Sequence, residues 1–157
     1  MSMFKWNEKY LTGIDLIDEQ HKEMVNIFNK LYKAYYESDK NQVTNTFLKK
    51  IFYELIDYMY IHFTTEENLL YRFNYPYFSE HKALHDEFKR ELTKMYDEFR
   101  YSSEYENKIV VTSHLILYIY EWVEGHILKS DKKYSDYIRE YGISMDKVKD
   151  FNPFNNE

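Results

Sequence analysis

The chain has 157 residues, no cysteine and a formal net charge of -6 at pH 7. This length predicts one domain over residues 1–157 with a sizeable core. Without cysteine there are no disulfides, zinc fingers or thiolate iron–sulfur sites, so imidazole and carboxylate are the only strong metal ligands. Because the charge is acidic and Lys and Arg are not clustered on one face, nucleic acid is not expected as a partner.

The composition favours an all-α chain. It has only three glycines and two prolines, and charged residues fall between apolar ones at helical intervals. The first ten residues lack the apolar segment of a secretory signal, so we expect a cytoplasmic protein. We expect no membrane insertion, because the apolar segment 109–128 carries two histidines and two glutamates that would be costly inside a bilayer. Most of the tyrosines are expected to cover helix surfaces with the hydroxyl in water.

An N-terminal arm, residues 1–14, is expected to pack Trp6 on the bundle. A first helix is predicted from about residue 18 to residue 38, because apolar residues recur there at steps of three and four. His21 begins this apolar stripe. By itself, a histidine on an apolar face is more often a core residue than a metal ligand.

A polar turn at 38–42 leads to a second predicted helix, from about 43 to 73, in which His62 and Glu66 occupy consecutive core positions. An inward carboxylate without a cation or metal partner costs several kcal/mol. Glu66 is therefore a candidate ligand. Its neighbour Glu67 is expected to point elsewhere, into solvent.

A break at 74–77 precedes a third predicted helix, with Ser79 as its expected N-cap. Its apolar stripe has the regular spacing of a bundle seam, with His81 and His85 at one end. Two adjacent unpaired imidazoles in a core would repel each other when protonated and leave nitrogens unpaired when neutral. A metal explains them better.

A polar stretch near 101–107 leads to a fourth predicted helix, from about 108 to 128, in which His126 continues the apolar stripe. His114 lies roughly 120° away on a regular helix and is not expected to be a ligand. Asp131 is roughly 140° off the face of His126, so both reach one centre only if the helix takes a π-type turn or ends there. Residues 134–157 are expected to form a short helix and a polar tail with Pro153, without chemistry of their own.

The candidates meet at one end of an antiparallel up-down-up-down four-helix bundle, since they lie near the start of helices one and three and near the end of helices two and four. They are His21, His62, Glu66, His81, His85, His126 and Asp131. Five imidazoles and two carboxylates are too many for one ion but suit two. Two octahedral ions offer twelve positions, of which five imidazoles, two bridging carboxylates and a shared oxygen atom fill all but one.

The order H…HxxxE…HxxxH…HxxxxD resembles the hemerythrin family, in particular its single-domain bacterial members. The resemblance rests on DEQH around His21, HFTTEE at 62–67, YPYFSEHKALH at 75–85 and WVEGHILKSD at 122–131. It implies two non-haem iron ions bridged by an oxo or hydroxo group. It also implies His81, His85 and His126 on a six-coordinate iron, His21 and His62 on a five-coordinate iron, and Glu66 and Asp131 as bridges.

The resemblance further implies end-on, reversible binding of dioxygen at the five-coordinate iron, for storage, delivery or sensing, in a pocket lined by Met24, Phe63 and Val123. Val123 is smaller than the leucine often found at this place, which suggests a roomier pocket. An oxygen-activating enzyme is less expected, because ferritin-like diiron enzymes use four carboxylates with Glu-x-x-His order. Peroxidase or nitric-oxide chemistry and manganese in place of iron stay open.

Overall fold

The computed structural model describes residues 2–38, 43–101 and 105–141. Four long helices dominate it: α1 (Asp15–Tyr32), α2 (Asn45–Arg72), α3 (Phe78–Tyr101) and α4 (Tyr105–Trp122). Shorter segments are the 3-10 turn η1 (Glu8–Tyr10), the π-helices η2 (Lys33–Glu37) and η4 (Val123–Asp131), and the final helix α5 (Lys132–Glu140). The described residues contain no strand, which confirms the predicted all-α class.

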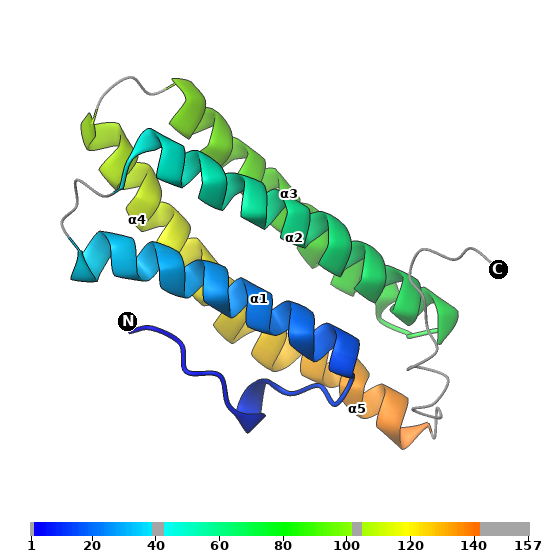
Figure 1. The fold of residues 1–157 in the computed structure, drawn as a ribbon. Helices are drawn as coiled ribbons and strands as arrows, with labels where there is room; N and C mark the ends of the chain where they lie inside the picture. Colours follow the sequence, from blue (N-terminus) through cyan, green and yellow to red (C-terminus); the bar gives the residue numbers. More distant parts are fainter. Residues whose placement is uncertain (1, 39–42, 102–104, 142–157) are drawn as a thin grey trace.

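The four long helices form a closed antiparallel bundle (Figure 1). Each helix packs against the next in the chain, and α1 also packs against α4. Every helix contributes fully buried apolar side chains to the shared core, for example Phe28, Phe52, Phe88 and Ile119, each 0% exposed. The connections are short, so the starts of α1 and α3 lie at the same end as the ends of α2 and η4, as predicted (Figure 1).

Some predicted boundaries differ from the structure. The first helix begins at Asp15 rather than near residue 18, and its end is the π-helix η2. Ser79 is not an N-cap: α3 begins at Phe78, and the His81 N–H donates to the Tyr77 carbonyl at 3.0 Å, so Ser79 lies inside the first turn. Residues 39–42, 102–104 and 142–157, including most of the predicted turn at 38–42 and the polar tail, lie outside the described residues. The fourth helix begins at Tyr105 rather than near residue 108, within the stretch predicted as a turn.

The expected distortion between His126 and Asp131 is present as the π-helix η4, which joins α4 to α5 without a break. A π-turn takes more residues than an α-turn, so it changes the direction in which later side chains point. His126 and Asp131 are consequently both buried, 4% and 0% exposed. The π-helix is therefore the local feature that brings two side chains five residues apart to one centre.

The N-terminal arm packs on the bundle, as predicted. Trp6 is partly buried against the main core of the bundle, and its ring stacks on Tyr10 at 5.2 Å between ring centroids. The arm is fixed to α1 by the buried Asp18 carboxylate, which accepts from the Thr12 N–H and hydroxyl at 2.7 Å each and from the Gly13 N–H at 3.1 Å. Gly13 has φ +83°, a conformation that favours glycine. This turn lies immediately before the helix that carries His21.

Replacing Asp18 with asparagine is expected to lower the free energy of unfolding by about 2 kcal/mol, because one of the two accepting oxygens becomes an amide donor facing another donor. Urea unfolding monitored by circular dichroism measures the change. Glu19→Gln is the matched control, since the Glu19 side chain is 69% exposed. Equal losses in the two variants would contradict the role given to Asp18.

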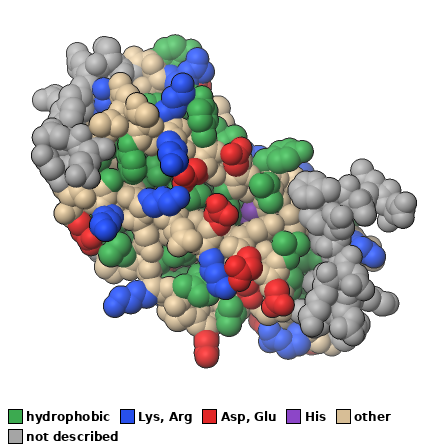
Figure 2. All heavy atoms as spheres, viewed as in Figure 1, with side chains coloured by type: hydrophobic (Ala, Val, Ile, Leu, Met, Phe, Trp, Pro, Cys, Tyr) green, Lys and Arg blue, Asp and Glu red, His purple; other side chains and the backbone are tan. Residues whose placement is uncertain are grey.

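No helix among the described residues is long and apolar enough to cross a bilayer. The apolar segment 109–128 buries Leu115, Ile116 and Ile119 within the bundle. Figure 2 shows acidic and basic side chains interspersed with hydrophobic ones on one face of the molecule.

Candidate metal centre

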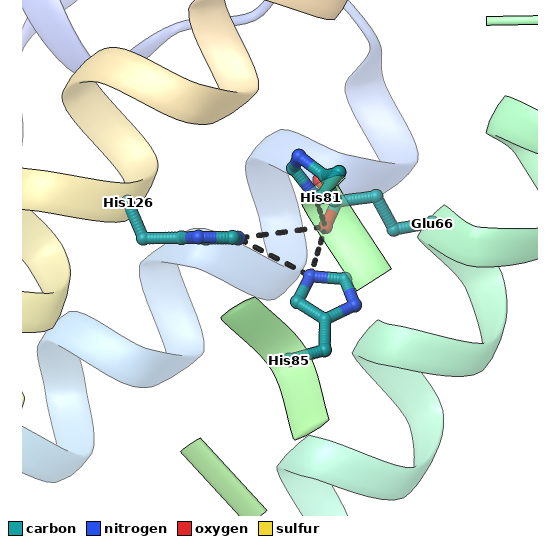
Figure 3. A group of neighbouring side chains, drawn as sticks. All are labelled: Glu66, His81, His85 and His126. Atoms are coloured by element: carbon teal, nitrogen blue, oxygen red, sulfur yellow. Dashed lines mark hydrogen bonds and ion pairs between the residues drawn. The ribbon is translucent and has the colours of Figure 1, made fainter. Parts of the chain in front are cut away.

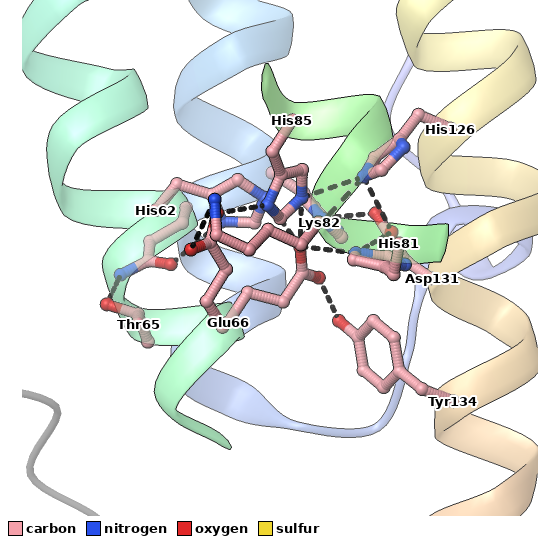
Figure 4. Close-up of polar contacts among 12 residues, drawn as sticks. His62, Thr65, Glu66, His81, Lys82, His85, His126, Asp131 and Tyr134 are labelled. Carbon is pink, nitrogen blue, oxygen red and sulfur yellow. Dashed lines mark hydrogen bonds and ion pairs between the residues drawn. The ribbon is translucent and has the colours of Figure 1, made fainter. Parts of the chain in front are cut away.

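The structure brings all seven predicted ligand residues together inside one end of the bundle. Figure 4 labels all of them except His21. They come from four elements, and each is at most 4% exposed. They are His21 of α1, His62 and Glu66 of α2, His81 and His85 of α3, and His126 and Asp131 of η4. His114 is exposed on α4 and belongs to neither group of candidate ligands, as expected.

The ligand atoms form two groups that share Glu66. One group is Glu66, His81, His85 and His126 (Figure 3), and the other is His21, His62, Glu66 and Asp131. Within each group, one ligand atom per residue lies within 4.8 Å of all the others. Two adjacent sites with a common carboxylate are therefore present, rather than one larger site.

The two carboxylates lie between the two sets of histidines. Asp131 Oδ2 is 3.0 Å from His21 Nε2, whereas its Oδ1 is 3.1 Å from His126 Nε2. Glu66 Oε2 is 2.9 Å from His85 Nε2 and 3.7 Å from His62 Nε2. Each carboxylate thus approaches histidines of both groups, which is the placement that a bridging ligand requires.

Several of these atoms lack a hydrogen-bond partner. Among the described buried side chains, His21 Nε2, His62 Nε2 and both Asp131 oxygens are unpaired. His21 Nε2 and Asp131 Oδ2 are close, but they lack the alignment of a hydrogen bond. Leaving such atoms unpaired in a protein interior costs several kcal/mol in total. Metal ions bound between converging nitrogen and oxygen lone pairs would satisfy them, so the residues fit a metal centre.

Three of the five ligand histidines are in the protonation state that metal binding needs, whereas nearby carboxylates outweigh burial at His85 and raise its pKa. Burial lowers the pKa of His21 to about 4 and that of His126 to about 3. Burial also lowers the pKa of His62 well below its usual value. These imidazoles are neutral near pH 7, so their lone pairs are free for a metal.

The two carboxylates have opposite pKa shifts. Burial, together with repulsion from Glu66, raises the pKa of Asp131 well above its usual value. Burial also opposes ionisation of Glu66, but the surrounding histidines, with His62 and His81 foremost, outweigh it and hold its pKa well below the usual value. Glu66 is therefore ionised in the metal-free protein. A bound cation would also favour the ionised form of Asp131.

The lowered pKa of His21 makes the metal-free protein sensitive to acid. The folded-state pKa lies below the ordinary 6.5, so the unfolded chain takes up the proton first and stability falls as pH drops from 6.5 toward 4. When the pH is lowered from about 8 to about 5, the free energy of unfolding of the apo wild type is expected to fall by about 2 kcal/mol more than that of His21→Gln. Urea unfolding of both proteins at the two pH values tests this. His114→Gln, at an exposed histidine, should change with pH as the wild type does.

Two side chains orient ligand histidines from outside the centre. Gln20 Oε1 lies 3.0 Å from His62 Nδ1, and Glu67 Oε1 lies 2.9 Å from His85 Nδ1. Such contacts fix the ring and direct the other nitrogen to the metal. The expectation that Glu67 is solvated is wrong: its side chain is 18% exposed and pairs with His85. Glu67 follows Glu66 directly in the sequence, but its contact with His85 depends on how α3 packs against α2.

Tyr134 on α5 is a further residue that sequence reasoning missed. It is fully buried, and its hydroxyl donates to Glu66 Oε1 at 2.5 Å (Figure 4). Burial and the negative charge of Glu66 raise the pKa of Tyr134, so the hydroxyl keeps its proton and donates. The expectation that this part of the chain carries no chemistry is therefore wrong for Tyr134. The available signal was its position three residues after Asp131, one helical turn away.

Aromatic rings cover the centre. Phe63 stacks on His85 and Trp122 stacks on His126, each at 3.9 Å between ring centroids. The three residues expected to line a dioxygen pocket, Met24, Phe63 and Val123, are at most 1% exposed. Two aromatic rings thus pack directly against ligand histidines, and the three expected pocket residues are buried.

The sequence model of the family described as "Hemerythrin HHE cation binding domain" matches residues 12–138. The chain belongs to the hemerythrin family. It is 28% identical to a bacteriohemerythrin of Clostridium acetobutylicum, a match that covers 85% of this chain and 100% of the relative. A bacteriohemerythrin of Stenotrophomonas maltophilia is 24% identical (88% and 84% covered), and a hemerythrin-like protein of Naegleria gruberi is 29% identical (85% and 92% covered). The matched family segment contains all seven hemerythrin-type ligand candidates.

Proposed function

We propose that this chain is one hemerythrin-like domain that holds two iron ions and binds dioxygen reversibly. The observation that carries the proposal is the pair of buried ligand groups that share Glu66. Membership of a cation-binding family and similarity to bacteriohemerythrins support it. Iron is preferred to manganese on the family relationship, because the nitrogen and oxygen donors accept both.

In this proposal His81, His85 and His126 would hold one iron, His21 and His62 would hold the other, and Glu66 and Asp131 would be shared between them. The iron with only two histidines would be the one open to dioxygen. The iron pair supplies the electrons that reversible dioxygen binding needs.

The protein's own residues keep the centre dry and oriented. Met24, Phe63 and Val123 are buried and apolar, and they offer no acid or base to a bound molecule. Gln20 and Glu67 hold two histidines in position, and Tyr134 holds Glu66. Five imidazole ligands and only two carboxylates favour reversible binding over oxygen–oxygen cleavage, so we propose a binding protein rather than an enzyme.

One experiment tests the proposal directly. Protein loaded with iron under anaerobic conditions is analysed for metal per chain, and its visible spectrum is followed through cycles of air and inert gas. Two irons per chain and an oxygen-dependent absorption band that disappears on deoxygenation are expected. One iron per chain, no such band, or repeated turnover of added peroxide would overturn it.

Replacing Val123 with leucine is expected to slow autoxidation of the oxygenated protein, because the larger side chain fills space beside the proposed dioxygen position. Val123 is 0% exposed, so the added methylene must be accommodated inside the pocket. The decay of the oxygen-dependent band over time gives the rate. Autoxidation as fast as that of the wild type would count against this pocket assignment.

A further inference from the structure

Two adjoining surface pockets lie over the centre, between α3 and the π-helix η4. One has a volume of about 270 Å³ and the other about 480 Å³. Leu84 and Ser130 line both, so the pockets are neighbours on one face of the molecule.

Each pocket reaches one of the proposed metal ligands. His126 lines the smaller pocket and His81 lines the larger one. These are the two ligands with measurable exposure, 4% each, whereas the other five are 0% exposed. The buried Nδ1 of His126 also has no hydrogen-bond partner among the described residues. At these pockets the enclosed centre therefore comes closest to solvent.

The pockets are acidic. Glu87 and Glu121 line the smaller pocket, to which no Lys or Arg contributes, and the larger one is lined by Glu80 together with Lys133. Glu87 has Arg90 at 3.8 Å outside the pocket. Three carboxylates against one lining ammonium group attract cations and raise their local concentration.

We propose that this pair of pockets is the route by which divalent metal ions enter and leave the centre. The carboxylates hold the hydrated ion, and His126 and His81 are the first imidazoles to replace its water. This inference rests on the metal centre of the proposed function. Six waters of hydration occupy roughly 180 Å³ at about 30 Å³ each, which fits the smaller pocket of about 270 Å³. Dioxygen is uncharged and would gain nothing from the carboxylates.

Two positions allow the route to be closed without changing a ligand. Leu84 lines both pockets and is 37% exposed, so tryptophan at this position would cover them. At Gly125 an added Cβ meets no atom within 4 Å, so a leucine there would extend into the smaller pocket. Leu117→Trp is the matched control, because Leu117 is 46% exposed on α4 and lines neither pocket.

The test is metal uptake by the apo-protein, measured by stopped-flow absorption after mixing with cobalt(II), with the final metal content determined separately. Leu84→Trp and Gly125→Leu are expected to take up metal several-fold more slowly than wild type and Leu117→Trp, and to reach the same content. Uptake at the wild-type rate in both pocket variants, or equal slowing in Leu117→Trp, overturns the route. A wild type that binds no cobalt instead overturns the metal centre itself.

The acidic lining is tested separately with the double variant Glu87→Gln/Glu121→Gln. Uptake at low salt is expected to slow about two- to tenfold, and the difference from wild type should shrink as salt is added. The control is Glu19→Gln/Glu140→Gln, at two exposed glutamates outside the pockets. If both double variants take up cobalt equally fast, the carboxylates of the pocket do not speed the entry of the cation.

Discussion

Replacing Glu66 with glutamine is expected to reduce iron binding from two ions per chain to less than one. Glu66 belongs to both ligand groups, and its charge is the one that the surrounding histidines stabilise. Glutamine has nearly the same shape, but it brings no negative charge to either ion. The measurement is metal content after anaerobic loading and desalting, with circular dichroism to establish that the variant is folded.

Glu67→Gln is the matched control, because this neighbouring carboxylate belongs to neither ligand group and meets the centre only through the outer nitrogen of His85. It should keep two irons and lose about 10- to 100-fold in affinity, as is usual when a group that orients a ligand is changed. Two tightly bound irons in Glu66→Gln would show that the shared carboxylate does not bridge the ions.

Removing the hydroxyl of Tyr134 is expected to lower the free energy of unfolding of the apo-protein by about 2–3 kcal/mol, since a buried hydrogen bond to a charged carboxylate is lost. The Tyr134 ring is fully buried, so phenylalanine fills the same space, and the loss reports on the hydroxyl. Urea unfolding of wild type and Tyr134→Phe gives the difference.

Tyr137→Phe, on the same helix, is the comparison. Its hydroxyl donates to the neutral carbonyls of Phe73 and Asn74 at 3.3 and 3.2 Å and is partly exposed. Tyr137→Phe should lower the free energy of unfolding by about 1 kcal/mol or less. If Tyr134→Phe were no more destabilising than Tyr137→Phe, the contact with Glu66 would contribute little to the apo-protein.

The helices could be predicted because their signals are local. Apolar residues at steps of three and four mark the buried face of each helix, and a buried histidine that continues such a stripe must point inward. The helical pattern therefore places His21, His62, His81, His85 and His126 on inward faces, and the up-down-up-down order of the helices predicts that they meet at one end of the bundle. Asp131 required a different argument: its spacing from His126 is wrong for an α-helix, so a shared centre needed either a π-type turn or a helix end, and the structure has a π-helix there.

The N-cap of α3 was predicted wrongly. Ser79 is of a residue type that is favoured at N-caps, but the turn that precedes the helix decides at which residue the helix starts. That turn contains Asn74 with φ +52°, and the Tyr75 N–H donates to the Leu70 carbonyl at 3.0 Å. Residue propensities alone do not predict the backbone conformation of this turn.

The sequence by itself determined the fold class and the seven residues that converge, because helical period and buried polarity are properties of single segments. The tertiary structure alone decided the contacts between segments distant in the chain. Glu67 contacts His85, 18 residues away in the chain, and Tyr134 contacts Glu66, 68 residues away. The spacing of apolar residues within one helix indicates neither contact. The same holds for the acidic pockets over His81 and His126, since they exist only where α3 lies beside the π-helix.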